Sequence, residues 1–115
     1  MKPKDVITIE DVSGAKVIHV KTHLDLDTVS LVKDQLLALA GKPQCKIVLD
    51  LENASYISSF GLSMLLQFND FVKKAGGRLV LAALHAFAKQ VFETTQLGSV
   101  FKVYDTVEAA VKAVT

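Results

Sequence analysis

The sequence SSFG at residues 58–61 places two adjacent hydroxyl groups between an apolar run and a strongly apolar helical pattern. A serine at this position could act as a catalytic nucleophile, accept a phosphate group or cap the helix that follows. A nucleophile elbow requires the pattern Gly-x-Ser-x-Gly, and here Tyr56 or Ile57 stands where the first glycine belongs. The motif for serine hydrolysis is therefore absent, and the other two roles stay open.

The three histidines, His19, His23 and His85, are scattered along the chain and show no spacing that would supply a base for these serines. His19 and His23 are four residues apart in extended chain, which separates them by about 13 Å at a rise of ~3.3 Å per residue, too far to share a metal ion. A phosphate-binding loop needs more glycines than residues 58–61 provide, and a lysine after them. We therefore expect no metal, no cofactor and no enzymatic activity.

Ser58 or Ser59 is well suited to be the N-cap of the following helix. A serine oxygen there accepts a hydrogen bond from a backbone N–H group that lacks a partner in the first turn, which stabilises the helix by ~1 kcal/mol. The same place favours an added phosphate, because the helix dipole is positive at its N-terminus. Capping and modification are therefore compatible at this turn.

The helix predicted over Phe60–Lys74 carries two apolar stripes. At about 100° per residue, one stripe contains Leu62, Leu65, Leu66, Asn69 and Val72. The opposite side contains Phe60, Met64 and Phe71. Either neighbouring helices bury this second stripe or it is free to contact a partner. We expect Phe60, Met64 and Phe71 to be exposed and to form part of a partner surface.

Apolar alternation and turn residues predict the elements that position this turn. The predicted strands are Val6–Val12, Ala15–Thr22, Cys45–Leu51, Arg78–Ala82 and Phe101–Tyr104. The predicted helices are Asp27–Ala40, Phe60–Lys74, about His85–Thr95 and a last helix that opens at Asp105. The order β-β-α-β-α-β-α-β-α predicts one α/β domain over residues 1–115, with a mixed, mostly parallel sheet of four or five strands and about four helices.

The third and fourth predicted strands alternate between two kinds of residue. One side carries Ile47, Leu49, Leu79 and Leu81, and the other carries Lys46, Asp50 and Arg78. Strands that helices cover on both faces are usually apolar throughout. We therefore expect the helices mainly on one face of the sheet, and Lys46, Asp50 and Arg78 on a face that the helices leave open.

The composition points away from nucleic acid and membranes. Thirteen Lys and Arg balance 12 Asp and Glu, and no block of like charge stands out. No apolar run approaches the ~20 residues that span a bilayer, and the N-terminal residues MKPKDVITIE lack the apolar centre of a signal peptide. The single cysteine, Cys45, suggests a reducing compartment. We expect a cytoplasmic protein whose partner is another protein or a small ligand.

Taken together, these residues resemble a STAS domain of the bacterial anti-sigma factor antagonist type. The segment IVLDLENASYISSFGLSML is similar to the family's strand, turn, D-S-S-G-L motif and helix. THLDLDTVSLVKDQL is similar to the family's G-x-L-D stretch, and GGRLVLAAL and TTQLGSVFKVYDTVEAAV match its later pattern. The resemblance covers nearly the whole chain.

The resemblance implies a non-enzymatic protein that binds an anti-sigma factor which is also a serine kinase. In such a pathway phosphorylation at the motif breaks the complex and a serine phosphatase restores it. A weak homodimer is also compatible with the family. The alternative within the family is a non-phosphorylated interaction subunit of a stressosome-like scaffold or of a transporter ATPase complex.

Carried over residue by residue, Ser58 stands where the family usually has Asp, and Ser59 matches its first serine. Phe60 occupies the position that is most often phosphorylated. Ser59 followed by Phe60 resembles the D-S-F of stressosome scaffolds, so Ser59 is the first candidate for phosphorylation and Ser58 the second. Asp25 matches the family's acidic residue near that site, although Thr22 replaces the family's glycine. The resemblance and the helix pattern together assign partner binding to Asp25, Phe60, Gly61, Met64 and Phe71.

Overall fold

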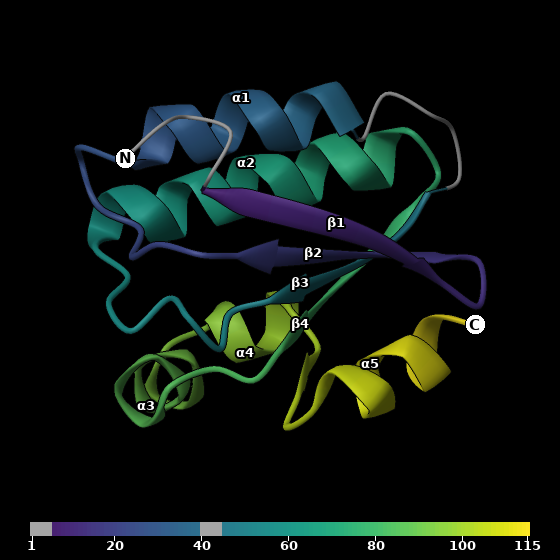
Figure 1. The fold of residues 1–115 in the computed structure, drawn as a ribbon. Helices are drawn as coiled ribbons and strands as arrows, with labels where there is room; N and C mark the ends of the chain where they lie inside the picture. Colours follow the sequence, from purple (N-terminus) through teal and green to yellow (C-terminus); the bar gives the residue numbers. More distant parts are fainter. Residues whose placement is uncertain (1–5, 40–44) are drawn as a thin grey trace.

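The computed structural model describes residues 6–39 and 45–115, which form one five-stranded mixed sheet with helices around it (Figure 1). The strands are β1 Ile7–Val12, β2 Ala15–Val20, β3 Lys46–Asp50, β4 Arg78–Ala82 and β5 Val103–Tyr104. They lie in the order β1-β2-β3-β4-β5; β1 is antiparallel to β2, and the other pairs are parallel. The predicted fold class is confirmed.

The helices follow the predicted order with one addition. They are α1 Val29–Leu39, α2 Ser59–Lys74, α3 Ala86–Thr94, α4 Leu97–Val100 and α5 Val107–Val114. The sequence did not predict α4, because a single turn of four residues is too short to show a helical period. The last helix begins after Thr106, whose hydroxyl accepts a hydrogen bond from the Ala109 N–H at 3.1 Å, so Thr106 is the N-cap in place of Asp105.

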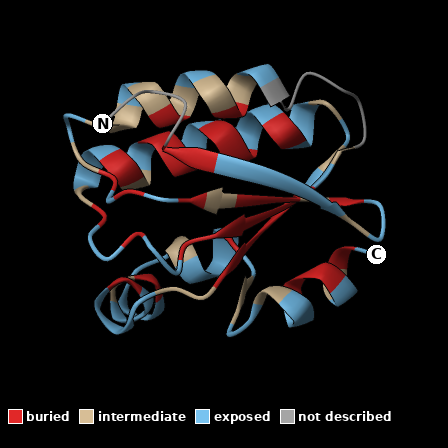
Figure 2. Ribbon diagram, viewed as in Figure 1, coloured by how far each residue is buried: buried red, intermediate tan, exposed pale blue. Residues whose placement is uncertain are grey.

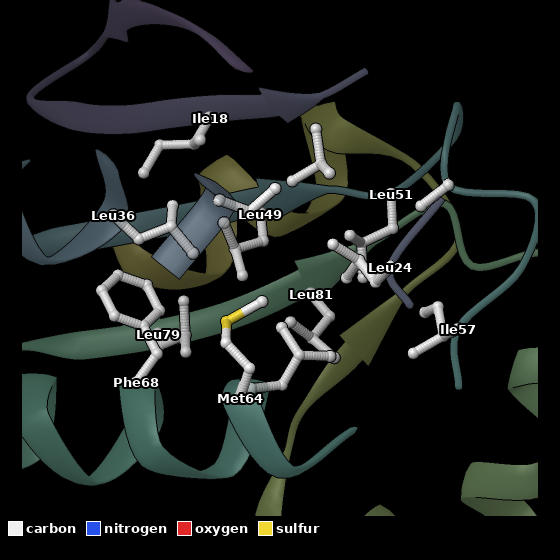
Figure 3. Packing of buried hydrophobic residues seen from close by; sticks show 14 of the residues in the cluster. Ile18, Leu24, Leu36, Leu49, Leu51, Ile57, Met64, Phe68, Leu79 and Leu81 are labelled. Atoms are coloured by element: carbon white, nitrogen blue, oxygen red, sulfur yellow. The ribbon is translucent and has the colours of Figure 1, made fainter. Parts of the chain in front are cut away.

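The main core lies between one face of the sheet and the helices α1, α2 and α3. Ile47, Leu49, Leu79 and Leu81 point into it, as the strand alternation predicted. Figure 3 shows Met64 and Phe68 reaching from α2 toward Leu49, Leu79 and Leu81, and Leu36 of α1 belongs to the same cluster. The buried side of α2 therefore packs on this face of the sheet.

The opposite face is not open, and this expectation was wrong. Helix α5 packs over β2, β3 and β4 through Ala110, Val111 and Val114, which meet a second apolar cluster on the sheet. Ala15, Val17, Val48, Val80 and Ala82 make up that cluster on the strands. Figure 2 shows the buried side of α5 turned toward the sheet.

Lys46, Asp50 and Arg78 do lie on the α5 side of the sheet, but at the ends of β3 and β4. Lys46 and Arg78 are exposed and pair in register, while Asp50 is buried. The Arg78 guanidinium donates a hydrogen bond to the Ala113 carbonyl of α5 at 3.3 Å. The charged residues flank a short apolar centre, so a helix of two turns covers the middle of the face and leaves its margins polar.

Among residues 6–39 and 45–115, none of the helices combines the length and the apolar character needed to cross a lipid bilayer.

Candidate functional site

Two loops at the carboxyl ends of β2 and β3 are held side by side. The Leu24 N–H donates to the Tyr56 carbonyl at 2.8 Å, and the Ser58 N–H donates to the Leu24 carbonyl at 2.8 Å. These bonds form a short parallel bridge between Leu24 and Ile57, whose side chains are buried. The start of α2 is therefore fixed to the segment that precedes α1.

Gly61 is required where α2 meets this bridge. A Cβ atom at Gly61 would lie 2.8 Å from both the Cβ and the carbonyl oxygen of Leu24, and 2.9 Å from Cγ2 of Ile57. Such distances are shorter than any normal contact, so only glycine lets the helix approach so closely. Gly61 is itself buried, so its influence on a partner would act through the position of the first turn.

The two serines have different environments. Ser58 is the N-cap: its backbone is extended, and its Oγ accepts a hydrogen bond from the Gly61 N–H at 3.3 Å. Ser59 is the first residue of α2 and is exposed, and its hydroxyl has no hydrogen-bond partner in residues 6–39 and 45–115. The capping role thus belongs to Ser58, while the hydroxyl of Ser59 is accessible to another molecule.

Asp25 organises the entry into α1. Its Oδ1 accepts hydrogen bonds from the backbone N–H groups of Asp27 at 2.9 Å and Thr28 at 3.2 Å, and its Oδ2 lies 2.9 Å from Nε2 of His23. Burial alone would raise the pKa of the Asp25 carboxyl, but these backbone hydrogen bonds and the neighbouring His23 lower it below its ordinary value. Asp25 is therefore a carboxylate, one residue away from Leu24 and the bridge.

Met64 is buried, and the expectation of an exposed Met64 was wrong. Only 3% of its surface is accessible, against 52% for Phe60 and 40% for Phe71. The buried side of α2 comprises Gly61, Met64, Leu65, Phe68, Asn69 and Val72. Compared with the predicted stripe, the buried side of α2 includes Met64 and leaves Leu66 exposed. The close approach of the helix at Gly61 sets this rotation about the helix axis.

Phe60 and Phe71 are both exposed but lie far apart on α2. They are separated by 11 residues, which corresponds to about 16 Å along the axis at ~1.5 Å per residue. Phe60 is next to Ser59, whereas Phe71 lies in the last turns of the helix. A partner that contacts both must cover nearly the whole length of α2.

Three exposed apolar residues near this edge were not predicted as site residues: Leu26, Tyr56 and Phe87. Leu26 and Tyr56 belong to the two bridged loops, and Phe87 lies in the first turn of α3. The His85 ring, which precedes α3, is hydrogen-bonded to the Glu52 carbonyl in the loop before α2. Tyr56 could have been found from the sequence, because in an extended segment it points away from its buried neighbour Ile57.

A shallow groove of about 210 Å³ runs between the N-terminal halves of α1 and α2. Phe60 and Met64 line it together with Val29, Ser30, Lys33, Ser63 and Gln67. Lys33 donates a hydrogen bond to the Gln67 side-chain carbonyl at 2.9 Å and so links the two helices across the groove. Although buried, Met64 therefore forms part of a depression large enough for a partner's side chain.

Within the described parts of the chain, no three His, Cys, Asp or Glu residues are grouped as a metal would require. His19 lies between two carboxylates: its Nδ1 is 2.6 Å from Asp50, and its Nε2 is 2.9 Å from Glu10. His23 pairs with Asp25. The histidines thus take part in local structure at strand ends and loops.

The sequence matches a known protein family. Residues 6–110 match the family model of the STAS domain. A Bordetella bronchiseptica protein named as an anti-sigma factor antagonist, BtrV, is 29% identical over 107 residues, which are 93% of this chain and 92% of that protein.

Two solved structures share the fold. The crystal structure of a Thermotoga maritima protein described as an anti-sigma factor antagonist aligns with a TM-score of 0.84 and 20% identity, over 97% of both chains. The Bacillus cell fate determinant SpoIIAA in its phosphorylated form aligns with a TM-score of 0.71 and 22% identity, over 95% of this chain and 99% of its own.

Proposed function

The chain belongs to the STAS domain family, and we propose that it acts as an anti-sigma factor antagonist controlled by phosphorylation of Ser59. Its partner in this proposal is an anti-sigma factor that is also a serine kinase, and a serine phosphatase reverses the modification. The proposal rests first on the relative in Bordetella bronchiseptica, which is named for the same role and aligns over nearly its whole length.

The choice of Ser59 rests on the different environments of the two serines. Ser58 already uses its Oγ to cap α2, whereas the Ser59 hydroxyl is exposed and has no partner among the described residues. A kinase can reach Ser59 without removing the cap. The Leu24–Ile57 bridge and the tight contact at Gly61 hold this turn in one position, so a partner meets a preformed surface.

A phosphate on Ser59 would act on the partner more than on the fold. It would add about −1.5 to −2 charges at the N-terminus of α2, where the helix dipole favours negative charge. A partner packed on the exposed Phe60 ring would have to desolvate that charge, which is costly. Asp25, ionised beside the bridge, would add repulsion from the same side.

The partner surface in this proposal combines Phe60, the groove between α1 and α2, and the exposed Leu26 and Tyr56 of the bridged loops. Aromatic and apolar residues that remain exposed next to a rigid turn are typical anchors of protein interfaces. Phe71 extends the same surface toward the end of α2.

The direct test uses the anti-sigma factor kinase encoded closest to this gene. The protein is incubated with that kinase and ATP, and the modified residue is located by mass spectrometry. Binding of Ser59→Asp, Ser59→Ala and wild type to the same kinase is then measured by calorimetry. We expect phosphate on Ser59, weak binding by Ser59→Asp and nearly normal binding by Ser59→Ala; phosphate on Ser58 would reassign the site.

One observation favours a second candidate, a constitutive interaction subunit of a scaffold or transporter assembly. Phe60 stands where the family most often has its phosphorylated serine, which removes that acceptor from this chain. In this case no residue becomes phosphorylated, and Ser59→Asp binds its partner as wild type does. The same two measurements therefore separate the candidates.

A further inference from the structure

Asn69, on the inner side of α2, has a side chain without a hydrogen-bond partner in the described parts of the chain. Only 5% of its surface is accessible, and no hydrogen bond of its amide is found with residues 6–39 or 45–115. Burying an amide without a partner is costly, and such groups usually bind something. Among the described residues, every side-chain N or O atom that is fully enclosed has a hydrogen-bond partner. The unpaired amide atoms of Asn69 therefore keep some accessible surface.

The Asn69 side chain lines a cavity of about 250 Å³ at the far end of α2 from Ser59. The walls come from the last turns of α2, the first residues of β4 and helix α4, with Lys73, Arg78, Leu79, Ser99 and Lys102 among them. Asn69 is 10 residues beyond Ser59, about 15 Å along the helix axis, so this cavity is separate from the phosphorylation site proposed at the start of α2.

The edge of β4 adds a backbone donor to this cavity. Leu81 donates its N–H to Lys102 and Ala83 donates to Tyr104, both toward β5, whereas Arg78 donates to Cys45 toward β3. Alternation along the strand therefore directs the N–H of Leu79 to the β5 side. Among the described residues, β5 is in register with Leu81 and Ala82 of β4 and does not extend as far as Leu79, which lines the cavity.

The charge around the cavity is positive. Lys73, Arg78 and Lys102 line it, and no acidic residue does so within the described chain. Lys73 and Lys102 form no ion pair within residues 6–39 and 45–115. The last carbonyls of α2 do not compete with an anion, because Phe71, Val72 and Lys73 already accept hydrogen bonds from the turn at residues 75–77.

We propose that this cavity binds a small oxyanion of the phosphate class. The Asn69 amide and the Leu79 N–H donate hydrogen bonds to its oxygens, and Lys73, Arg78 and Lys102 supply the compensating charge. The donors are already fixed by α2 and by the sheet, so the anion meets an ordered site.

A second cavity indicates what the anion is attached to. It has a volume of about 580 Å³ and shares Ser99 and Lys102 with the first cavity. Phe92, Phe101 and Tyr104 line it together with Lys89 and Glu93, and Phe92 and Phe101 pack with their ring centroids 5.7 Å apart. Its size falls in the range of about 300–1,000 Å³ that small-molecule sites occupy. The ligand class is therefore a phosphomonoester with an aromatic or apolar body.

The test is an NMR titration of the full chain, labelled with nitrogen-15, with inorganic phosphate and with phenyl phosphate. Ionic strength is held constant with chloride, so that general salt effects are matched. We expect saturable shifts centred on the N–H signals of Asn69, Leu79 and Lys102, and tighter binding of phenyl phosphate, with further shifts at Phe92 and Tyr104.

Asn69→Leu is the informative variant, because it keeps a similar volume and removes the amide. We expect it to weaken phosphate binding about tenfold or more, as for the loss of a hydrogen bond to a charged group. Lys74→Gln is the matched control: it removes a positive charge from the same helix outside the cavity, and binding should change little. Should Asn69→Leu fail to fold, Lys102→Gln with Lys74→Gln gives the same comparison.

Shifts that do not saturate, that appear equally with chloride or that spread over all lysines would overturn the proposal. Equal affinities of Asn69→Leu and Lys74→Gln would do so as well. Equal affinity for inorganic and phenyl phosphate would show that only the smaller cavity takes part in binding, and would contradict the role proposed for the larger cavity.

Discussion

His19 Nδ1 lies 2.6 Å from Asp50 Oδ2 across the parallel pair β2 and β3. On its other side, His19 Nε2 lies 2.9 Å from Glu10 Oε1 of β1. Burial acts to lower the pKa of His19, but hydrogen bonds and charge from Glu10 and Asp50 outweigh it, so the pKa is raised above its ordinary value. When it is protonated, the His19 ring therefore links three neighbouring strands at the margin of the face that α5 covers.

This arrangement predicts a pH-dependent stability. Because the pKa of His19 is raised in the folded state, its contribution is fully present below the unfolded pKa of ~6.5 and is lost as pH rises through the folded value. His19→Gln should lower the free energy of unfolding by about 1 to 2 kcal/mol at pH 5.5 and by less at pH 8.5. Urea unfolding of both proteins at the two pH values measures this, and a difference independent of pH would contradict it.

Ser58 and Ser59 should differ in their effect on stability. Ser58→Ala removes the N-cap and should lower the free energy of unfolding by about 1 kcal/mol. Ser59→Ala removes an exposed hydroxyl without a described partner and should change it by less than about 0.5 kcal/mol. Thermal unfolding of the two single variants checks the assignment. The opposite order would make Ser59 the cap and leave Ser58 as the accessible serine.

Gly61→Ala should destabilise the protein even though alanine favours helices. The added Cβ would lie 2.8 Å from Leu24, and relieving that overlap costs about 1 to 3 kcal/mol, more than the ~1 kcal/mol gained in helix propensity. The Leu24–Ile57 bridge should loosen with it. Hydrogen exchange of the Leu24 and Ser58 N–H groups reports this directly; unchanged protection together with a higher melting temperature would refute the close contact.

Substitutions in α2 should distinguish residues that stabilise the core from residues that bind the partner. Met64→Ala should cost about 2 to 5 kcal/mol of stability, because Met64 is buried in the core. Phe60→Ser should leave stability nearly unchanged and weaken partner binding by about 2 kcal/mol or more.

Phe71→Ser tests how far the partner extends along α2, and we expect it to weaken binding without unfolding the protein. Calorimetry for binding and urea unfolding for stability are run on each of the three variants. Normal binding by Phe71→Ser would confine the partner to the first half of the helix.

The sequence was sufficient for the fold class and for the turn at which α2 begins, since the strong alternation in β3 and β4 and the serine pair before α2 are local signals. It failed where packing decides. The rotation of α2 buries Met64 and exposes Leu66. It follows from the contact of Gly61 with Leu24, a residue that lies far from it in the sequence. The coverage of Val48 by α5 likewise depends on a tertiary contact that strand periodicity does not reveal.

The sequence could not predict that the Asn69 amide lacks a hydrogen-bond partner among the described residues. Whether a polar residue in an apolar stripe finds a partner depends on the tertiary structure around it. Its position in the stripe of α2 was recognised, but its environment depends on the short strand β5 and on α4. Neither feature has a strong local pattern.

The position of α5 along the chain has a consequence for biosynthesis. The helix covers Val17, Val48 and Val80, yet it follows every strand on which it packs. As the chain leaves the ribosome, this apolar face stays without its cover until residues 107–114 have emerged. Nascent chains that stall before that point would present a sheet with one uncovered apolar face, and such surfaces aggregate or recruit chaperones.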